Sequence, residues 1–171
     1  MVTKSMKEVL QMKDLKLVAN ECMSMLDNVG IEYGNIKNWE INTRAIKRWG
    51  QCKKRDGGFI ISISNKLLDD SVDNKALETT VLHELLHTVN GCFNHGNKWQ
   101  NMANKINNRY GYNIKTTTSH EEKGIEREPY KYMVKCQSCG REVGRYKMSS
   151  IIQNPQNWKC GCCGGKFERI L

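Results

Sequence analysis

Residues 77–89 read LETTVLHELLHTV, and this stretch decides the fold of the chain. Its apolar side chains recur every three or four positions, which is the pattern of an amphipathic helix with one buried face. Asp73 or Asn74 can cap such a helix at its start. Asn90-Gly91 can end it, because both residues tolerate a left-handed backbone. The sequence therefore predicts a helix that carries two histidines towards the core of a folded domain.

The two histidines and the glutamate of this helix, His83, Glu84 and His87, form an HExxH arrangement. Residues four apart lie on one helix face, so the two imidazoles can bind one metal ion through neutral nitrogens. Glu84 lies about 100° round the helix from His83, where it can take a proton from a water held by the metal. The alternative is an amphipathic helix with two histidines by chance, but the apolar neighbours and a further histidine downstream disfavour it. The pattern predicts a hydrolytic zinc site with Glu84 as general base.

A third protein ligand is expected, because catalytic zinc usually has three protein ligands and one open position. His95 and His120 are the remaining histidines of the chain. His95 follows His87 by eight residues and comes just after Gly91, where the chain can turn back towards the metal. His120 lies in a polar segment. We expect His95 to be the third ligand, and His120 is the alternative.

The flanking segments predict helices and strands around this site. Apolar spacing predicts helices at residues 4–28 and 98–110, and strand pattern over residues 41–64 with a turn at 53–58 predicts a hairpin. Arg44, Trp49 and the strand at 61–64 are candidates for lining a substrate groove, with an exposed strand edge binding an extended peptide. The plainer interpretation makes Trp49 part of the core and Arg44 a surface charge.

A second metal site is predicted near the C-terminus, where five of the eight cysteines lie. Two CxxC pairs separated by 20 residues are typical of a four-thiolate zinc site, here Cys136, Cys139, Cys160 and Cys163. Cys162 competes with Cys163, but only Cys163 has the CxxC spacing to Cys160. Disulfides or free thiols are the alternative, which an intracellular chain disfavours. The zinc would stabilise a module too small for a core of its own.

Charge and composition bear on partners and location. The 171 residues carry a net charge of +9, which makes a polyanion partner plausible, although solubility alone explains it equally well. No apolar run approaches the ~20 residues that span a bilayer, and residues 1–15 lack the apolar region of a signal peptide. We expect an intracellular, cytoplasmic protein without a membrane partner.

Basic and aromatic side chains are interleaved in the C-terminal module. Such a mixture suits single-stranded nucleic acid, and an ordinary solvated face around a small aromatic core is the equal alternative. The candidate nucleic-acid contacts are Lys135, Arg141, Arg145, Tyr146, Lys147 and Trp158.

The residues of the central site resemble the SprT-like domain family, which includes bacterial SprT proteins and the DNA–protein crosslink protease Spartan. The resemblance rests on His83-Glu-Leu-Leu-His87 followed by Asn94-His95-Gly96-Asn-Lys-Trp99 and, loosely, on the strand segments 44–52 and 61–67. It implies a zincin-like α+β fold, with zinc held by the three histidines and Glu84 catalytic. It also implies a link to DNA, and a C-terminal zinc ribbon is common in this family.

The sequence as a whole predicts three parts: a SprT-like metallopeptidase domain with helices packed on a small antiparallel sheet at 1–112, a polar linker at 113–129 and a four-cysteine zinc ribbon at 130–171. Two zinc ions per chain are expected, one catalytic and one structural. The predicted function is zinc-dependent cleavage of protein substrates, with DNA-bound or DNA-crosslinked proteins as candidates. The rival is a non-proteolytic zinc-dependent DNA-binding or adaptor protein, which the intact Glu84 disfavours because a structural site needs no base. A hydrolase of non-peptide amides is a further alternative.

Overall fold

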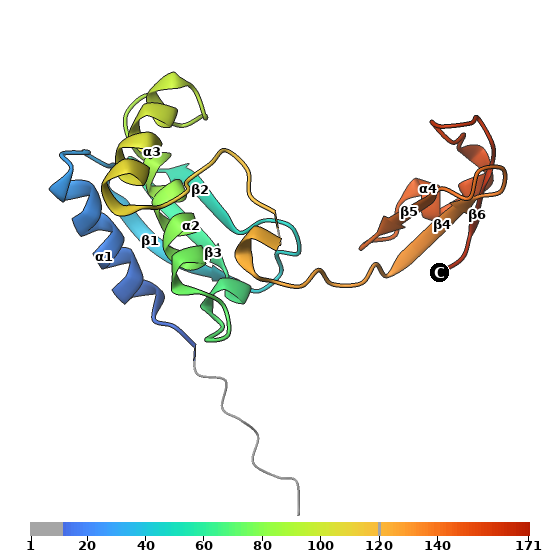
Figure 1. Cartoon of the computed structure of the whole chain (residues 1–171), viewed down its shortest axis with the longest axis horizontal. Coiled ribbons are helices and arrows are strands. Elements are labelled where there is room, and N and C mark those ends of the chain that lie inside the picture. Colours follow the sequence, from blue (N-terminus) through green and yellow to red (C-terminus); the bar gives the residue numbers. More distant parts are fainter. Residues whose placement is uncertain (1–11, 120) are drawn as a thin grey trace, which may run out of the picture. The chain divides into compact units, whose positions relative to one another are not determined.

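A computed structural model describes residues 12–119 and 121–171, and the chain divides into two compact units, Met1–Glu126 and Arg127–Leu171 (Figure 1). The segment 113–129, predicted as a linker, therefore falls mostly within the first unit. Ile114 and Lys123 are both buried there, each 4% exposed, so this segment is not solvated throughout. The polar composition of the segment gave no sign that Lys123 contacts helix α2 (Asn74–Leu86), because hydrogen bonds and not apolar side chains make this contact.

Within residues 12–119 and 121–126, the first unit holds three α-helices and a three-stranded sheet. The helices are α1 (Leu15–Asn28), α2 (Asn74–Leu86) and α3 (Asn97–Tyr110), and the strands are β1 (Ile36–Asn42), β2 (Gly50–Arg55) and β3 (Gly58–Ser64). The strand order is β1-β3-β2, with β1 parallel and β2 antiparallel to β3. The prediction of an antiparallel sheet was thus wrong for one of the two strand pairs, and the sheet is mixed.

Strand β1 is the element that the sequence pattern did not reveal. The register between β1 and β3 shifts between Ile36 and Asn38, which is a bulge or a similar irregularity. Such a shift breaks the alternation of inward and outward side chains. Ile36 and Trp39 consequently both pack on the core although they stand three positions apart.

Strands β2 and β3 form the predicted hairpin, joined by a turn at Asp56-Gly57 in which both residues have positive φ. Strand β3 is central and pairs on both sides, and Ile61–Ser64 is buried throughout. Residues 61–64 therefore have no free edge for a substrate, and the prediction of an exposed strand edge there was wrong. The open edge nearest α2 belongs to β2.

Helix α2 lies at the centre of this unit and packs on β2 and β3, with α1 and α3 against it (Figure 1). Asp73 caps its start by accepting a hydrogen bond from the Lys75 amide at 2.9 Å. The helix ends at Leu86, earlier than the predicted end at Asn90-Gly91, and single turns continue to Gly91. Helix α1 begins at Leu15 because Asp14 caps it, and the part of the predicted helix at 4–11 lies outside the described residues.

The second unit is a small antiparallel sheet with a short helix. Its strands β4 (Tyr132–Cys136), β5 (Glu142–Arg145) and β6 (Phe167–Arg169) have the order β5-β4-β6, and α4 spans Ser150–Gln153. Five buried residues form its core: Val134, Cys136, Ile152, Cys160 and Phe167. Two of these are cysteines, which fits a module that depends on a metal for stability.

Candidate active site

Helix α2 and the loop that leads into α3 bring three histidines together. His83 stands in the last turn of α2, and His87 follows the helix with φ −68° and ψ −14°, so it keeps the helical direction one turn further on. The chain then turns at Gly91 (φ +79°) and returns His95 to the same place. The Nε2 atom of His83 lies 3.2 Å from that of His87 and 3.0 Å from that of His95.

Two backbone carbonyls fix which ring nitrogens face the centre of this cluster. The Nδ1 atom of His83 lies 2.9 Å from the Lys115 carbonyl oxygen, and that of His87 lies 3.0 Å from the Cys92 carbonyl oxygen. A carbonyl oxygen only accepts, so each Nδ1 carries the proton and each neutral ring has its lone pair on Nε2. Two lone pairs 3.2 Å apart repel one another unless a cation lies between them.

The geometry of the cluster fits zinc. Tetrahedral zinc with bonds of about 2.0–2.1 Å places neighbouring nitrogens roughly 3.3 Å apart. The Nε2 separations of 3.0 and 3.2 Å are close to this value. Burial lowers the pKa of all three histidines, that of His83 to about 3, which keeps the rings in the neutral form that binds metal. Hydrogen bonds from Nδ1 to carbonyls are the usual second layer of such a site.

The indole ring of Trp99, which is 1% exposed, forms the floor beneath the three imidazoles. Its ring centroid lies 4.8, 5.7 and 4.6 Å from those of His83, His87 and His95. Trp99 stands in the first turn of α3, and the Gln100 side chain donates a 3.0 Å hydrogen bond to the His95 carbonyl. Helix α3 thus limits the movement of His95, which lies on a loop.

Glu84 lies beside the histidine cluster against the edge strand β2. It is 6% exposed, and a Cβ atom added to Gly50 would lie only 2.5 Å from its Oε1. Burial raises the pKa of Glu84 to about 7, while the Cys52 amide and the charge of Arg48 oppose that rise. A general base works best when its pKa is near the ambient pH, so this carboxylate is suited to proton transfer.

Clefts open on both sides of the cluster. A cleft of about 220 Å³ adjoins His83 and Glu84 and is lined by Trp49, Gly50 and the segment Lys115–Thr118. A second one of about 360 Å³ adjoins His87 and is lined by Lys54 at the far end of β2, Phe59 and Phe93. Trp49 is buried yet touches the first cleft, whereas Arg44 lines a different hollow with Glu40 and Lys53 and is no part of either.

The four cysteines expected to bind a second metal come together in the second unit. Cys136 and Cys163 have their Sγ atoms 3.5 Å apart, those of Cys139 and Cys160 are 3.7 Å apart, and all four lie within 4.8 Å of one another. Tetrahedral zinc with Zn–S bonds of about 2.3 Å places sulfurs roughly 3.8 Å apart, so the cluster fits zinc. Cys162 is exposed and is not a member of the cluster.

Tight turns hold these thiolates. Gly140 (φ +72°) and Gly164 (φ +74°) each donate an amide hydrogen bond to the first cysteine of their pair, to the carbonyls of Cys136 at 2.9 Å and Cys160 at 2.8 Å. Amide groups of the first turn, above all that of Cys139, lower the pKa of Cys136 to about 6. Amides of the second turn also lower the pKa of Cys160, whereas hydrogen bonds with neighbouring cysteine side chains raise those of Cys139 and Cys163. The Cys136 thiolate is therefore available near neutral pH for metal binding.

The candidate nucleic-acid contacts do not form one surface. Arg141, Arg145 and Trp158, which is 46% exposed, line a cleft of about 330 Å³ together with Lys159. Lys135 pairs with Glu142, and side chains alternate along a strand, so Lys135 faces away from Arg141. Tyr146 packs against Tyr130 with ring centroids 4.8 Å apart and ring planes tilted by 41°, and neither Tyr146 nor Lys147 lines the cleft.

Other contributors to the site left no sequence signal. The carbonyls of Lys115 and Cys92 act through the backbone, so their side chains do not reveal them. Gly50 matters only because β2 approaches Glu84 closely. His120, the alternative third ligand, lies outside the described residues.

A buried carboxylate beside three converging imidazoles forms a candidate metal site on and beside helix α2. The chain belongs to the SprT-like family, because the sequence model of that family matches residues 19–120, more than half of the chain, with all three histidines and Glu84 inside the match. This membership suggests a metallopeptidase-like function. No curated protein sequence matches the chain. Among the described residues, no helix has both the length and the apolar character needed to cross a membrane.

Proposed function

We propose that this protein is a zinc-dependent endopeptidase of SprT-like type. One observation carries the proposal: the buried Glu84 carboxylate lies between three neutral histidines and the open edge of a strand. Zinc, held by His83, His87 and His95, would supply Lewis acidity that polarises a carbonyl and brings the pKa of water near 7. A metal site that served only to hold the fold together would not need this base.

Glu84 performs the proton transfers of the reaction. Its carboxylate accepts a proton from water as the water oxygen bonds to the peptide carbonyl carbon, and it then returns that proton to the departing amine. The carbon–nitrogen bond breaks, and one water is consumed for each peptide bond. Arg48 and the Cys52 amide keep a fraction of Glu84 ionised at neutral pH against the effect of burial.

Strand β2 provides the platform for an extended peptide. Among the described residues, β3 is its one partner strand, so its other edge is open there. An extended peptide can add to such an edge through backbone hydrogen bonds. One cleft lies at Gly50 and the other at Lys54, four residues further along, which is about 13 Å in a strand. A substrate that runs on past the metal in both directions is cleaved internally.

The decisive experiment compares the zinc-loaded wild type with Glu84→Gln on quenched peptides and a denatured protein. We expect hydrolysis to fall by about 10²-fold or more, because glutamine cannot accept the proton, while both zinc ions remain. Glu32→Gln, the same change at an exposed position in the first unit, should leave the rate unchanged. Cleavage of peptides by Glu84→Gln at the wild-type rate would contradict the proposal. A wild type that binds zinc and cleaves nothing would contradict it too and would favour the non-proteolytic adaptor protein.

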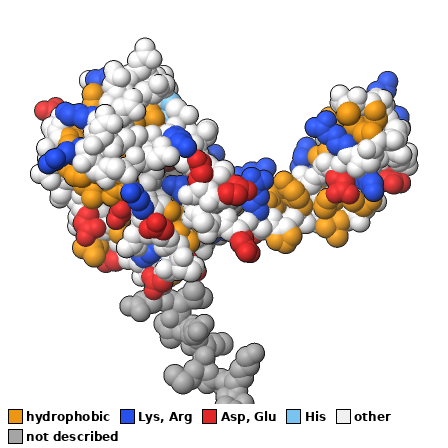
Figure 2. Space-filling view, in the orientation of Figure 1, with side chains coloured by type: hydrophobic (Ala, Val, Ile, Leu, Met, Phe, Trp, Pro, Cys, Tyr) orange, Lys and Arg blue, Asp and Glu red, His pale blue; other side chains and the backbone are white. Residues whose placement is uncertain are grey.

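We also propose that the second unit binds DNA with single-stranded character and so directs cleavage to DNA-bound proteins. Trp158 beside Arg141 and Arg145 supports this, because an exposed aromatic ring next to guanidinium groups suits stacking on an unpaired base. Figure 2 shows basic side chains next to hydrophobic ones on this unit. Holding enzyme and substrate on one strand raises their effective concentration.

This second proposal is tested by titrating single-stranded DNA at two salt concentrations. Trp158→Ala should weaken binding by about 1–3 kcal/mol, the usual value of one stacked base. Lys135→Ala, on the other face of the sheet, should have a smaller effect. The proposal fails if wild type and Trp158→Ala bind single-stranded DNA with equal affinity, or if a DNA-bound protein is cleaved at the same rate with and without the DNA strand. The second unit would then have another partner.

A further inference from the structure

The charged side chains that line the cleft beside Glu84 are mostly basic. Four cations line it, Lys47, Arg48, Lys115 and Lys123, and Glu84 is the one acidic residue of the lining. Zinc bound next to it would add further positive charge. A cleft with walls of low dielectric and one sign of charge concentrates ligands of the opposite sign.

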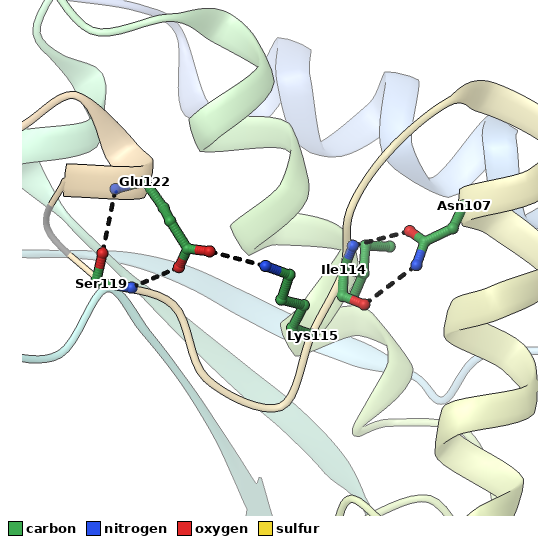
Figure 3. A network of polar contacts seen from close by, with 5 residues as sticks. All are labelled: Asn107, Ile114, Lys115, Ser119 and Glu122. Carbon is green, nitrogen blue, oxygen red and sulfur yellow. Dashed lines mark hydrogen bonds and ion pairs between the residues drawn. The ribbon is translucent and has the colours of Figure 1, made fainter.

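One wall of this cleft is held rigidly. Figure 3 shows that Asn107 clamps Ile114 through two hydrogen bonds, from the Ile114 amide at 2.8 Å and to its carbonyl at 3.1 Å. Glu122 accepts hydrogen bonds from the Lys115 Nζ and the Ser119 amide, both at 2.8 Å. The Lys115 carbonyl also binds the His83 ring, which ties this wall to the metal site. The ion pair with Glu122 offsets the charge of Lys115, and the described lining as a whole still holds more basic than acidic side chains.

Lys123 is the most informative of the cations in this cleft, because it is 4% exposed. Its Nζ donates to the Ala76 carbonyl and to the Thr80 hydroxyl, both at 2.9 Å. Both acceptors are neutral oxygens on α2, about two turns and one turn before Glu84 respectively. A buried charge is costly unless an opposite charge accompanies it. Burial lowers the pKa of Lys123 to about 8 even though the charge of Glu122 opposes that shift, so an anion in the cleft would stabilise the charged form further.

The size of the cleft limits the ligand. About 220 Å³ is less than the 300–1,000 Å³ of a typical small-molecule pocket, so one side chain or chain end fits it better than a larger molecule. Thr116, Thr117 and Thr118 add hydroxyl donors to the wall. The cleft at the other end of β2 differs in character, since Phe59 and the 61% exposed Phe93 line it.

We propose that the basic cleft is a specificity subsite that accepts a carboxylate group of the peptide substrate, close to the bond that is cleaved. The carboxylate belongs to an aspartate or glutamate side chain or to the C-terminus of the substrate. This inference rests on the proposed endopeptidase function. It assigns Arg48 and Lys47 the role of selecting the substrate.

The test uses the full-length, zinc-loaded protein and a set of quenched peptides. The peptides differ only in carrying Glu, Gln or Lys at each of four positions on either side of the cleaved bond, and each is made with a free and an amidated C-terminus. At one position we expect kcat/KM for Glu to exceed that for Gln by about 5- to 10-fold, which corresponds to a partly screened ion pair. The preference should shrink as salt is added. A requirement for the free C-terminus would identify the chain end as the source of the carboxylate.

Variants then locate the subsite. Arg48→Gln and Lys47→Gln should each reduce the Glu-to-Gln ratio, and a general loss of rate cancels from this ratio because it affects both peptides. Lys105→Gln removes one positive charge from an exposed position on α3 outside the cleft and should leave the ratio unchanged. An unchanged ratio in both cleft variants, or a wild type that prefers Gln or Lys, would overturn the inference while leaving the peptidase intact.

Binding to Glu84→Gln separates this inference from the proposed function. Anisotropy of a labelled peptide on this variant should show tighter binding of the Glu form than of the Gln form, whether or not the wild type cleaves. If no peptide is cleaved but this difference is present, the endopeptidase proposal falls and the anion subsite stands. If an oligonucleotide displaces the peptide and Arg48→Gln weakens DNA binding instead, the cleft is a phosphate site and the carboxylate proposal is wrong.

Discussion

Replacing Gly50 with alanine should abolish most of the proposed peptidase activity without loss of the proposed zinc ions. The added Cβ would lie 2.5, 2.6 and 2.9 Å from the Oε1, Cγ and Cδ atoms of Glu84, whereas ordinary contact begins at 3.4 Å. Relieving the closest of these contacts requires a shift of 0.9 Å, the difference between 3.4 and 2.5 Å. Glu84 is buried, so either its carboxylate moves away from the reacting atoms or β2 moves with the amide of Cys52.

A misplacement of about 1 Å costs on the order of 10²-fold in rate, so Gly50→Ala should lower kcat by that factor, or about 2.7 kcal/mol of barrier. The assay is peptide hydrolysis together with zinc analysis, and two zinc ions per chain should remain. Gly161→Ala is the matched control, because a Cβ there meets nothing within 4 Å and its φ is not positive. Activity of Gly50→Ala within about 3-fold of the wild type would refute the close contact between β2 and the general base.

Two further predictions concern metal binding and pH. His95→Ala should lower the zinc content from two ions to one, because the four-cysteine site should keep its ion. His120→Ala should keep both ions, and the reverse pattern would make His120 the third ligand. In the zinc-free protein, burial holds the folded pKa of His83 near 3 against 6.5 when unfolded, so the unfolded state binds more protons and acid destabilises the fold. Glu84 acts in the opposite sense, because its folded pKa of about 7 exceeds the unfolded 4.5. Glu84→Gln should therefore lose stability more steeply than the wild type between pH 6.5 and 4.5 in urea titrations, and equal slopes would contradict the raised pKa.

The sequence by itself determined the features that depend on local spacing. Two histidines four positions apart on a helix share one face, and this follows from the helical repeat alone. The CxxC pairs with their following glycines likewise define short turns whose geometry depends on a few neighbouring residues. The hairpin at 50–64 followed from a turn signal between two strand segments. The same local reasoning missed β1, because the register shift near Ile36 disturbs the alternation on which a strand prediction relies.

Only the tertiary structure decided what surrounds these local motifs. Glu84 is a buried base because β2, more than 25 positions earlier in the chain, passes against it at Gly50. The rings of His83 and His87 are oriented by the carbonyls of Lys115 and Cys92, and backbone groups are present at every residue, so no side-chain pattern marks them. Lys123 appeared to be part of a solvated linker, yet it contributes charge to the cleft beside Glu84, which it follows by 39 positions in the sequence. Contacts between distant segments depend on the order and edges of the sheet, and a local sequence pattern carries no information about either.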